Sequence, residues 1–206
     1  MSEPSRQAHW QNVYATKAEN EVSWFQESPA ISLELIRAAG APPRTSVIDV
    51  GGGASRLADA LIEDGYEDVT VLDVSEAALS TAQSRLGPRA ARVSWLVADA
   101  TTWEPSRLYD VWHDRAAFHF LTESADRSAY VERLRRAVLE GGTAIIGTFA
   151  MDGPERCSGL RIVRYDAKSL GETLGNSFAL VRTSRHDHIT PMGGTQRFQF
   201  SVFRRQ

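Results

Sequence analysis

The chain has 206 residues, of which 42% are hydrophobic and 24% are charged, a composition typical of one folded domain with its own core. It excludes intrinsic disorder and, with Cys157 as the lone cysteine, a disulfide scaffold. The formal net charge of −3 gives no broad positive field for nucleic acid, although residues 151–206 are mildly basic. With no apolar run long enough for a membrane span and no secretory leader pattern, we expect a cytoplasmic protein without membrane or nucleic-acid partners.

Helical and strand patterns alternate through the first 150 residues. Strand patterns bounded by glycine, proline or polar residues predict strands over 46–50, 69–74, 93–98, 109–113 and 143–150. Apolar residues at helical spacing predict helices over 29–39, from 57 to a stop at Gly65, over 76–86, and over 128–139 with a stop at Gly141-Gly142. Such alternation predicts an α/β fold with a parallel sheet and helices on both faces.

The last third of the chain breaks this alternation. After a predicted helix over 167–174, two strand-like runs over 178–186 and 195–204 are joined by the short segment 189–194. This connection is too short for a crossover helix, so the two strands must pair antiparallel. We therefore expect one domain over 1–206, with a mostly parallel sheet that ends in an antiparallel hairpin.

Three predicted strands end in acidic or glycine residues. The first ends in Asp49-Val50-Gly51-Gly52-Gly53, a turn in which glycine lets the backbone approach a ligand before the next helix. Asp73 closes the second strand, where a carboxylate can accept both ribose hydroxyls of a nucleoside, and Asp99 follows the third. Because carboxyl ends of parallel strands share one sheet edge, these residues predict a nucleoside site there.

This pattern resembles the class I, Rossmann-like S-adenosylmethionine-dependent methyltransferases, over about residues 45–150 and the closing hairpin. The resemblance implies a three-layer sandwich with a seven-stranded sheet, and S-adenosylmethionine as cofactor with S-adenosylhomocysteine as product. It further implies that Gly51 and Gly53 lie under the methionine part, and that Asp49 orders the turn or meets the amino group. It assigns the remaining contacts to Asp73 (ribose hydroxyls), Val74 (adenine face), Asp99 (adenine amino group) and Ala100 (a backbone N–H).

The N-terminal segment carries a W-x-x-x-Y pattern formed by Trp10 and Tyr14. The pattern is similar to the lead-in of a subset of these enzymes, in which an N-terminal lid covers the cofactor. We therefore expect residues 1–27 to form a lid, with Trp10 and Tyr14 on the cofactor side. An aromatic helix that merely packs on the sheet is the alternative.

The segment after the fourth predicted strand supplies candidates for the acceptor side. His113, Asp114, Arg115 and His119 lie where related folds face the transferred methyl group. Histidine can accept a proton near neutral pH and arginine can pair with a substrate carboxylate, so we name His113, Arg115 and His119 as candidate catalytic residues. An Asp114–Arg115 ion pair with His119 capping a turn is the structural alternative.

Two further features carry less weight. His186-Asp187-His188 has metal-ligand residue types, but neighbours on a strand point to opposite faces, so we expect no metal site. Cys157 lies in a loop after the fifth strand, at the edge that holds the other candidates. Whether it is reactive stays open.

The predicted activity is methyl transfer to an acceptor, in a monomer or homodimer. An NAD-dependent oxidoreductase would share the glycine turn, but the Tyr-x-x-x-Lys pair of short-chain dehydrogenases is absent, because Leu134 follows Tyr130 at that spacing. A non-catalytic nucleoside-binding module stays open. The [DNS]-P-P-[YF] motif of DNA amino-methylating enzymes is also absent after the fourth strand. A small-molecule acceptor is therefore favoured, and a protein-lysine methyltransferase is the alternative.

Overall fold

The centre of the molecule is a sheet, in a computed structural model that describes residues 5–206. Its seven strands run in the order β3-β2-β1-β4-β5-β9-β8. Their bounds are Ser46–Val50 (β1), Asp68–Asp73 (β2), Val93–Val97 (β3), Tyr109–Arg115 (β4), Val138–Phe149 (β5), Phe178–Ile189 (β8) and Thr195–Arg205 (β9). Strands β1 to β5 pair in parallel, whereas β9 pairs antiparallel with both β5 and β8. The predicted parallel sheet with a closing antiparallel hairpin is confirmed.

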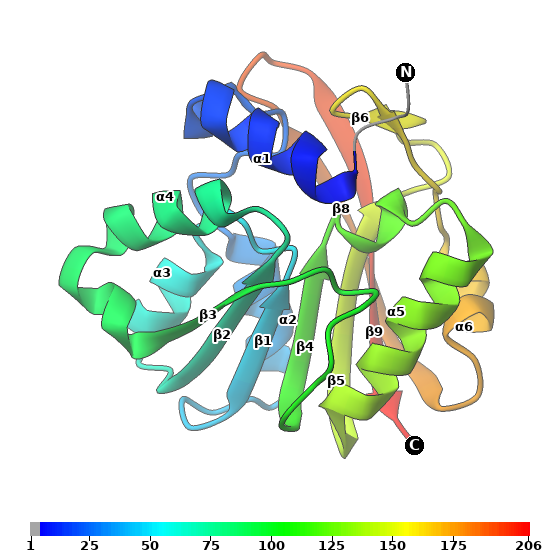
Figure 1. Cartoon of the computed structure of the whole chain (residues 1–206). Helices are drawn as coiled ribbons and strands as arrows, with labels where there is room; N and C mark the ends of the chain where they lie inside the picture. The colour runs from blue at the N-terminus through cyan, green and yellow to red at the C-terminus, as the bar shows by residue number, and fades with distance from the viewer. Residues whose placement is uncertain (1–4) are drawn as a thin grey trace.

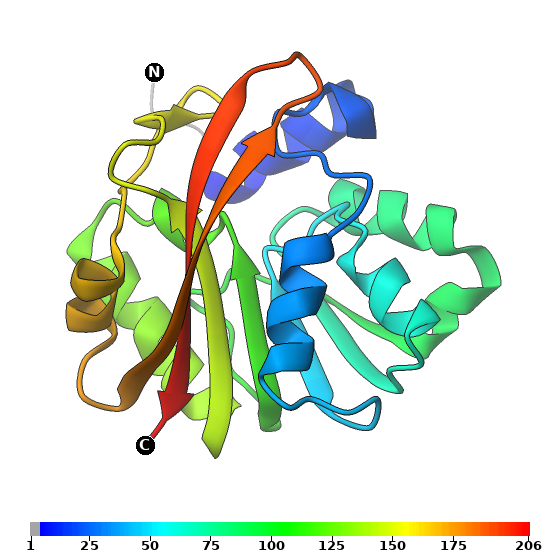
Figure 2. The same cartoon turned by 180° about the vertical axis from the view of Figure 1, so that it is seen from behind.

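Helices cover both faces of the sheet and make a three-layer sandwich (Figure 1 and Figure 2). One apolar core lies between the sheet and the helices α2 (Ala30–Ala38), α3 (Leu57–Glu63) and α4 (Glu76–Leu86). The other core joins the opposite face to α5 (Ser124–Ala137) and α6 (Ala167–Leu174).

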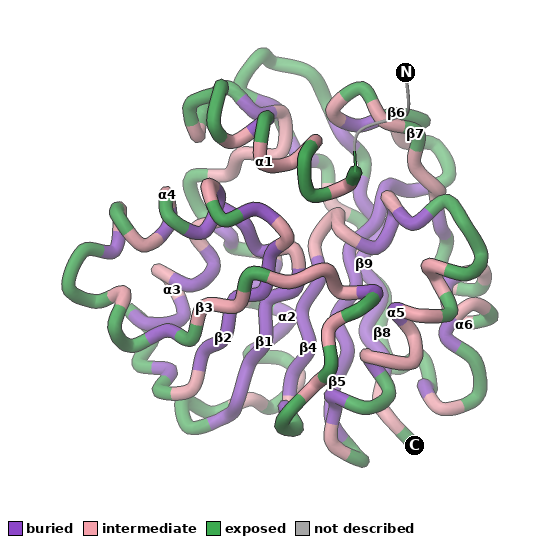
Figure 3. The backbone as a smooth tube through the Cα atoms, in the orientation of Figure 1, coloured by how far each residue is buried: buried purple, intermediate pink, exposed green. Residues whose placement is uncertain are grey.

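Burial follows from these layers. Every residue of β1 is buried, because the strand is central and covered on both sides. The edge strand β8 is largely exposed between Ala179 and Asp187. Figure 3 shows the buried residues along the central strands and the exposed ones on the outer surfaces.

The predicted boundary between the helix over 128–139 and the strand over 143–150 was wrong. The helix begins at Ser124, and the strand starts at Val138, before the two glycines that resemble a helix stop. Gly141 has a φ of +72°, and the pairing of β4 with β5 shifts register between Tyr109 and Val111. The glycines therefore form an irregularity inside a strand, which local sequence does not distinguish from a helix end.

The segments above the strand ends position the site. Helix α1 (Arg6–Thr16) crosses the carboxyl edge of the sheet (Figure 1), and the short turn η1 (Glu19–Glu21) follows it. The turn η2 (Gly87–Arg92) follows α4, η3 (Phe118–Phe120) follows β4, and β6 (Arg156–Cys157) pairs with β7 (Leu160–Arg161). Residues 1–4 of the predicted lid lie outside the described part of the chain.

None of the helices within residues 5–206 has the length and apolarity that crossing a membrane requires.

Candidate active site

A cavity lies at the carboxyl edge of the sheet, under α1. It encloses about 1310 Å³ of empty space, its open mouth included, so a nucleoside cofactor and a second small molecule have room. Its wall contains ten of the residues predicted for the site: Trp10, Tyr14, Asp49, Gly51, Asp73, Val74, Asp99, Ala100, His113 and Arg115. Gly53 and His119 are not part of this wall.

The glycine turn after β1 is built for close approach. Gly51 and Gly53 have φ of +68° and +51°, a region that other residues rarely adopt. A Cβ on Gly51 would lie 2.4 Å from that of Ala117, and one on Gly53 would lie 2.8 Å from the Tyr14 hydroxyl. The turn is thus held against the segment after β4 on one side and against α1 on the other.

Asp73 is buried at the end of β2. Its Oδ1 accepts a hydrogen bond from the Ser75 amide at 2.8 Å. Burial raises the pKa of Asp73 to about 7, and the neighbouring carboxylate of Asp49 adds to the rise. Amides of Gly53 and Val74 act in the opposite direction. A ligand that donates hydrogen bonds to this carboxylate would favour its charged form.

Asp99 connects the sheet edge to α1. Its Oδ1 accepts from the Thr101 amide at 2.8 Å and hydroxyl at 2.7 Å, and its Oδ2 accepts from Arg6 at 2.6 Å. Arg6 also pairs with Asp126 at 2.6 Å. Burial by itself would raise the pKa of Asp99, but the bonds from Thr101 and Arg6 lower it overall. The role of Arg6 was missed, because nothing in its local sequence indicates these partners.

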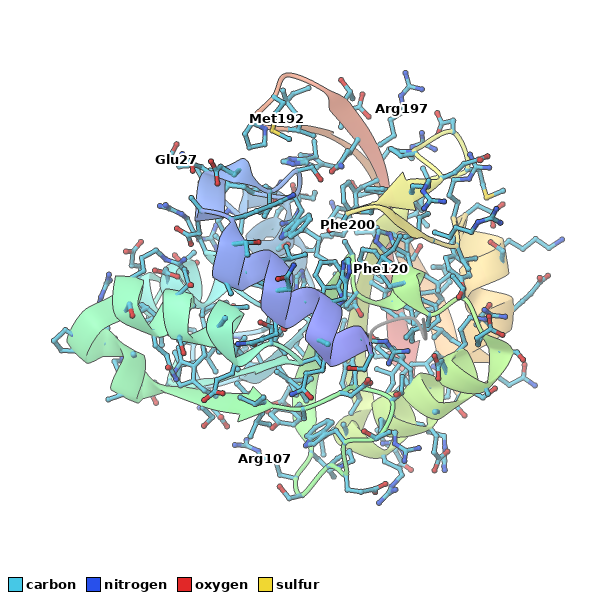
Figure 4. All side chains as sticks on the ribbon, turned by 45° about the horizontal axis from the view of Figure 1, so that its top comes forward. Glu27, Arg107, Phe120, Met192, Arg197 and Phe200 are labelled. Atoms are coloured by element: carbon cyan, nitrogen blue, oxygen red, sulfur yellow. The ribbon has the colours of Figure 1, made fainter. Side chains whose placement is uncertain are left out.

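The segment from α1 to Phe25 covers the cavity with aromatic rings. Trp10 packs edge-on against Trp24 and Phe120, with ring centroids 5.6 and 4.9 Å apart. The Trp24 indole N–H donates to the Tyr14 hydroxyl at 3.1 Å. Figure 4 looks onto this edge, with α1 beside the labelled Phe120. Trp10 and Tyr14 therefore face the cavity from one side of α1.

His113 has both ring nitrogens engaged by the protein. Nδ1 lies 2.7 Å from Asp49 Oδ1, and Nε2 lies 2.9 Å from the Ser32 hydroxyl. Asp49 and His113 are partners in the register of β1 and β4, which brings the two side chains together. This arrangement suits His113 for orienting Asp49. Both ring nitrogens are engaged, so neither is free to take a proton from the methyl acceptor, which is the role proposed from sequence.

Arg115 lines the cavity from the end of β4. It donates to the Trp24 carbonyl at 2.7 Å and lies over the Phe198 ring, 5.9 Å from the centroid. It does not pair with Asp114, the structural alternative raised from sequence. Asp114 instead accepts from the Ala117 amide and the Tyr130 hydroxyl, at 2.9 and 2.6 Å.

The expectation that His119 meets an acceptor is not supported by its position. The ring is fully buried in η3, beside Phe120 and Phe149, and lies outside the cavity wall. Burial lowers its pKa to about 3, with a contribution from Arg115, so the imidazole is neutral at physiological pH. Sequence spacing placed it at the edge, but the η3 turn directs it into the core.

Arg56 is a second cation that sequence reasoning missed. It immediately precedes α3 after the glycine turn, lines the cavity, and lies over the Phe25 ring at 5.4 Å. Its Nη2 is 3.6 Å from Glu19, and its buried Nε has no partner within residues 5–206. An arginine directly after a glycine turn, where a ligand is expected, was the available signal.

The histidines of the His186-Asp187-His188 run lie on the edge strand β8. His186 and His188 face Phe198 and Gln196 across the β8–β9 register, and His188 Nε2 lies 2.8 Å from the Ser23 carbonyl. In the described part of the chain, no three His, Cys, Asp or Glu side chains are arranged to hold a metal ion.

Comparisons with known proteins agree on one family. The family described as "Methyltransferase domain" matches residues 47–142. A Bos taurus "eEF1A lysine and N-terminal methyltransferase" is 26% identical over 141 residues, which are 66% of this chain and 19% of that protein. A Methylobacterium radiotolerans "Trans-aconitate 2-methyltransferase" is 32% identical over 141 residues, which are 68% of this chain and 49% of that protein. The matches span half or less of the length of these curated relatives.

Solved structures share the fold over nearly the whole chain. A structure described as "Conversion of a Disulfide Bond into a Thioacetal Group during Echinomycin Biosynthesis" has a TM-score of 0.76, with 22% identity and 97% and 93% coverage of the two chains. The N-methyltransferase NodS from Bradyrhizobium japonicum WM9, in complex with S-adenosylhomocysteine, has a TM-score of 0.73, with 16% identity and 95% and 97% coverage.

Proposed function

We propose that this chain, which belongs to the class I, Rossmann-like S-adenosylmethionine-dependent methyltransferases, transfers a methyl group from that cofactor to a small molecule. The observation that carries the proposal is the cavity itself. It joins the acidic strand ends to a second half that is covered by the aromatic rings of α1 and the segment to Phe25.

The residues of the first half fit the cofactor. Asp73 would accept hydrogen bonds from the ribose hydroxyls, and the adenine would lie between Val74 and Ala100. Asp99 would receive the adenine amino group, sharing its carboxylate with Arg6. The glycine turn would lie under the methionine part, whose carboxylate Arg56 would pair with. Acids thus meet the donors of the cofactor, and a cation meets its carboxylate.

S-adenosylmethionine supplies an activated methyl group on a sulfonium, so the protein needs to align the two molecules and exclude water. The rings of Trp10, Tyr14 and Trp24, which contact one another over the cavity, would exclude water from the reactants beneath them. His113 holds Asp49 in place beneath it. These groups position the reactants rather than react themselves.

The cover also favours a small acceptor over a protein side chain. Trp10, Trp24 and Phe120 form a continuous aromatic contact over the cavity, tied down through Arg6 and Asp99. A lysine on a folded protein would have to displace this contact, whereas a small molecule can be enclosed under it. The curated relatives are named for both protein and small-molecule acceptors, so they do not decide between the two.

The experiment is to incubate the chain with methyl-tritiated S-adenosylmethionine and a bacterial metabolite extract, and separately with the protein fraction of the same cells. We expect label in the low-mass fraction and production of S-adenosylhomocysteine. Label in the protein fraction alone would support the protein-lysine alternative. Cofactor binding without any transfer would support a non-catalytic nucleoside-binding module.

A further inference from the structure

Arg115 is the cation of the acceptor half of the cavity, and its surroundings are largely apolar. Its guanidinium lies over the Phe198 ring and donates to one backbone carbonyl, that of Trp24. Within residues 5–206 it has no carboxylate within ion-pair distance. By contrast, the partly buried Arg85 pairs with both Glu19 and Asp59, and Arg6 pairs with Asp99 and Asp126.

Within residues 5–206, no anionic side chain contacts Arg115 directly. Burial raises the pKa of the Cys157 thiol to about 11, and burial with the nearby Asp73 raises that of the Tyr14 hydroxyl still further, so both are neutral. Asp49 attracts Arg115 at longer range, but His113 holds one of its carboxylate oxygens. Arg115 is only partly exposed and, in the described part of the chain, has no carboxylate in direct contact, so an anionic ligand that pairs with its guanidinium would be favoured.

Apart from Asp49 and Asp73, which are assigned to the cofactor, the described acidic, histidine and tyrosine side chains of the cavity wall are engaged by the protein. Both ring nitrogens of His113 are engaged, and Tyr130 is engaged with Asp114. Asp99 is held by Arg6, and Glu19 pairs with Arg85 and Arg56. An acceptor that must lose a proton would have to use a group that is already engaged, whereas an acceptor that arrives ionised needs no base.

We propose that the acceptor is a carboxylate, held through one oxygen by Arg115 and methylated on the other. This rests on the proposed function and names its substrate class. A lone pair of the carboxylate oxygen forms the new O–CH₃ bond while the S–CH₃ bond breaks, and its electron pair goes to sulfur. The products are a methyl ester and S-adenosylhomocysteine, and no proton moves. The anion also lies between two cations, the guanidinium and the sulfonium, and is attracted by both.

In the alternative assignment, Arg115 pairs with the carboxylate of the cofactor rather than with the acceptor. Arg56 already lies at the glycine-turn end of the cavity, and within residues 5–206 its buried Nε has no partner. Substitutions of the two arginines can therefore serve as controls for each other. Binding of S-adenosylhomocysteine and of 5′-methylthioadenosine, which lacks the amino acid, separates their roles. We expect Arg56→Met to weaken S-adenosylhomocysteine alone, by at least about tenfold, and Arg115→Met to leave both affinities within about threefold. If Arg115→Met weakens S-adenosylhomocysteine alone, the inference is wrong.

The chemical class of the acceptor is tested by treating the labelled product with base. The wild type, Arg115→Met and the exposed control Arg161→Met are given methyl-tritiated S-adenosylmethionine with a metabolite extract, and with a set of aliphatic and aromatic carboxylic acids beside their amides. A methyl ester releases volatile tritiated methanol in base. We expect base-released label from acids and not from amides, unchanged in Arg161→Met and at least about tenfold lower in Arg115→Met. Base-stable label, or no label while S-adenosylhomocysteine binds, overturns the inference. Absence of S-adenosylhomocysteine binding overturns the proposed function instead.

Discussion

The two halves of the cavity differ in how they are built. The half proposed for the cofactor consists of residues at or just after the ends of three neighbouring parallel strands, namely the glycine turn, Asp73 and Asp99. The acceptor half brings together α1, the segment around Trp24, the end of β4 and the β6–β9 region. The first half is determined by short-range sequence and strand order, and the second by contacts between distant segments. The first should therefore be sensitive to backbone changes, and the second to changes in single contacts.

Gly51→Ala should destabilise the fold more than any other single substitution proposed for the cavity. An alanine there must adopt a left-handed conformation, which costs about 1–2 kcal/mol, and its Cβ would overlap that of Ala117, which adds about 1–3 kcal/mol. Gly65→Ala is the matched control, because Gly65 has a φ of +86° but open space around its Cβ position. Denaturant unfolding should show a larger loss for Gly51→Ala. Equal losses would mean that the turn is not closely packed against the segment after β4.

The pH dependence of stability should report on Asp73. Its pKa is about 7 in the folded protein and about 3.9 in an unfolded chain. Between these values the folded state holds a proton that the unfolded state has lost, so stability from this group is highest below pH 4 and falls as the pH rises to 7. Relative to Asp73→Asn, the ligand-free wild type should lose about 1.4 kcal/mol per pH unit between pH 5 and 7.

Asp114 and His119 also titrate differently in the folded state, but they are present in both proteins. The difference between the two unfolding curves therefore isolates Asp73. Parallel curves would show that Asp73 is already charged in the ligand-free protein.

Arg6→Ala should loosen the cover without disturbing the sheet. Arg6 and Asp99 are partly exposed, so their ion pair contributes about 1 kcal/mol or less. Proteolysis within residues 1–25 should become up to about fivefold faster, and S-adenosylhomocysteine should slow it. Arg37→Ala, which removes an exposed ion pair with Asp64 away from the cavity, is the control. Cleavage that responds neither to the substitution nor to the ligand would argue against a lid.

His119→Leu should have the smallest effect on turnover. The ring lies outside the cavity wall, and its Nδ1 accepts one long hydrogen bond of 3.4 Å from the Phe149 amide. Melting temperature should fall, while methyl transfer stays within about threefold of wild type, which is under about 0.7 kcal/mol. A larger loss of methyl transfer at unchanged cofactor affinity would show that His119 acts on the acceptor.

Sequence predicted the strands and helices below the cavity far better than the side-chain contacts around it. The predicted bounds of β1, α4 and α6 match the structure, because caps and stops there are local. The start of β5 was misplaced because a glycine irregularity inside a strand resembles a helix stop. His113 was assigned to the acceptor, since its pairing with Asp49 depends on the register of β1 with β4, which the sequence does not display. The β6–β7 hairpin lies where the sequence predicts a loop, because pairing of two residues gives no periodic pattern.

The most direct test of the account is calorimetric titration of the wild type and Asp73→Ala with S-adenosylhomocysteine, and of the wild type with NADH. Asp73 would lose hydrogen bonds to the ribose worth about 1.5–3 kcal/mol. We expect one molecule of S-adenosylhomocysteine per chain, an affinity about 10- to 100-fold weaker in Asp73→Ala, and no binding of NADH. Binding of NADH without binding of S-adenosylhomocysteine at millimolar concentration would contradict the assigned cofactor, and Asp73→Ala binding S-adenosylhomocysteine as tightly as the wild type would contradict the ribose contact.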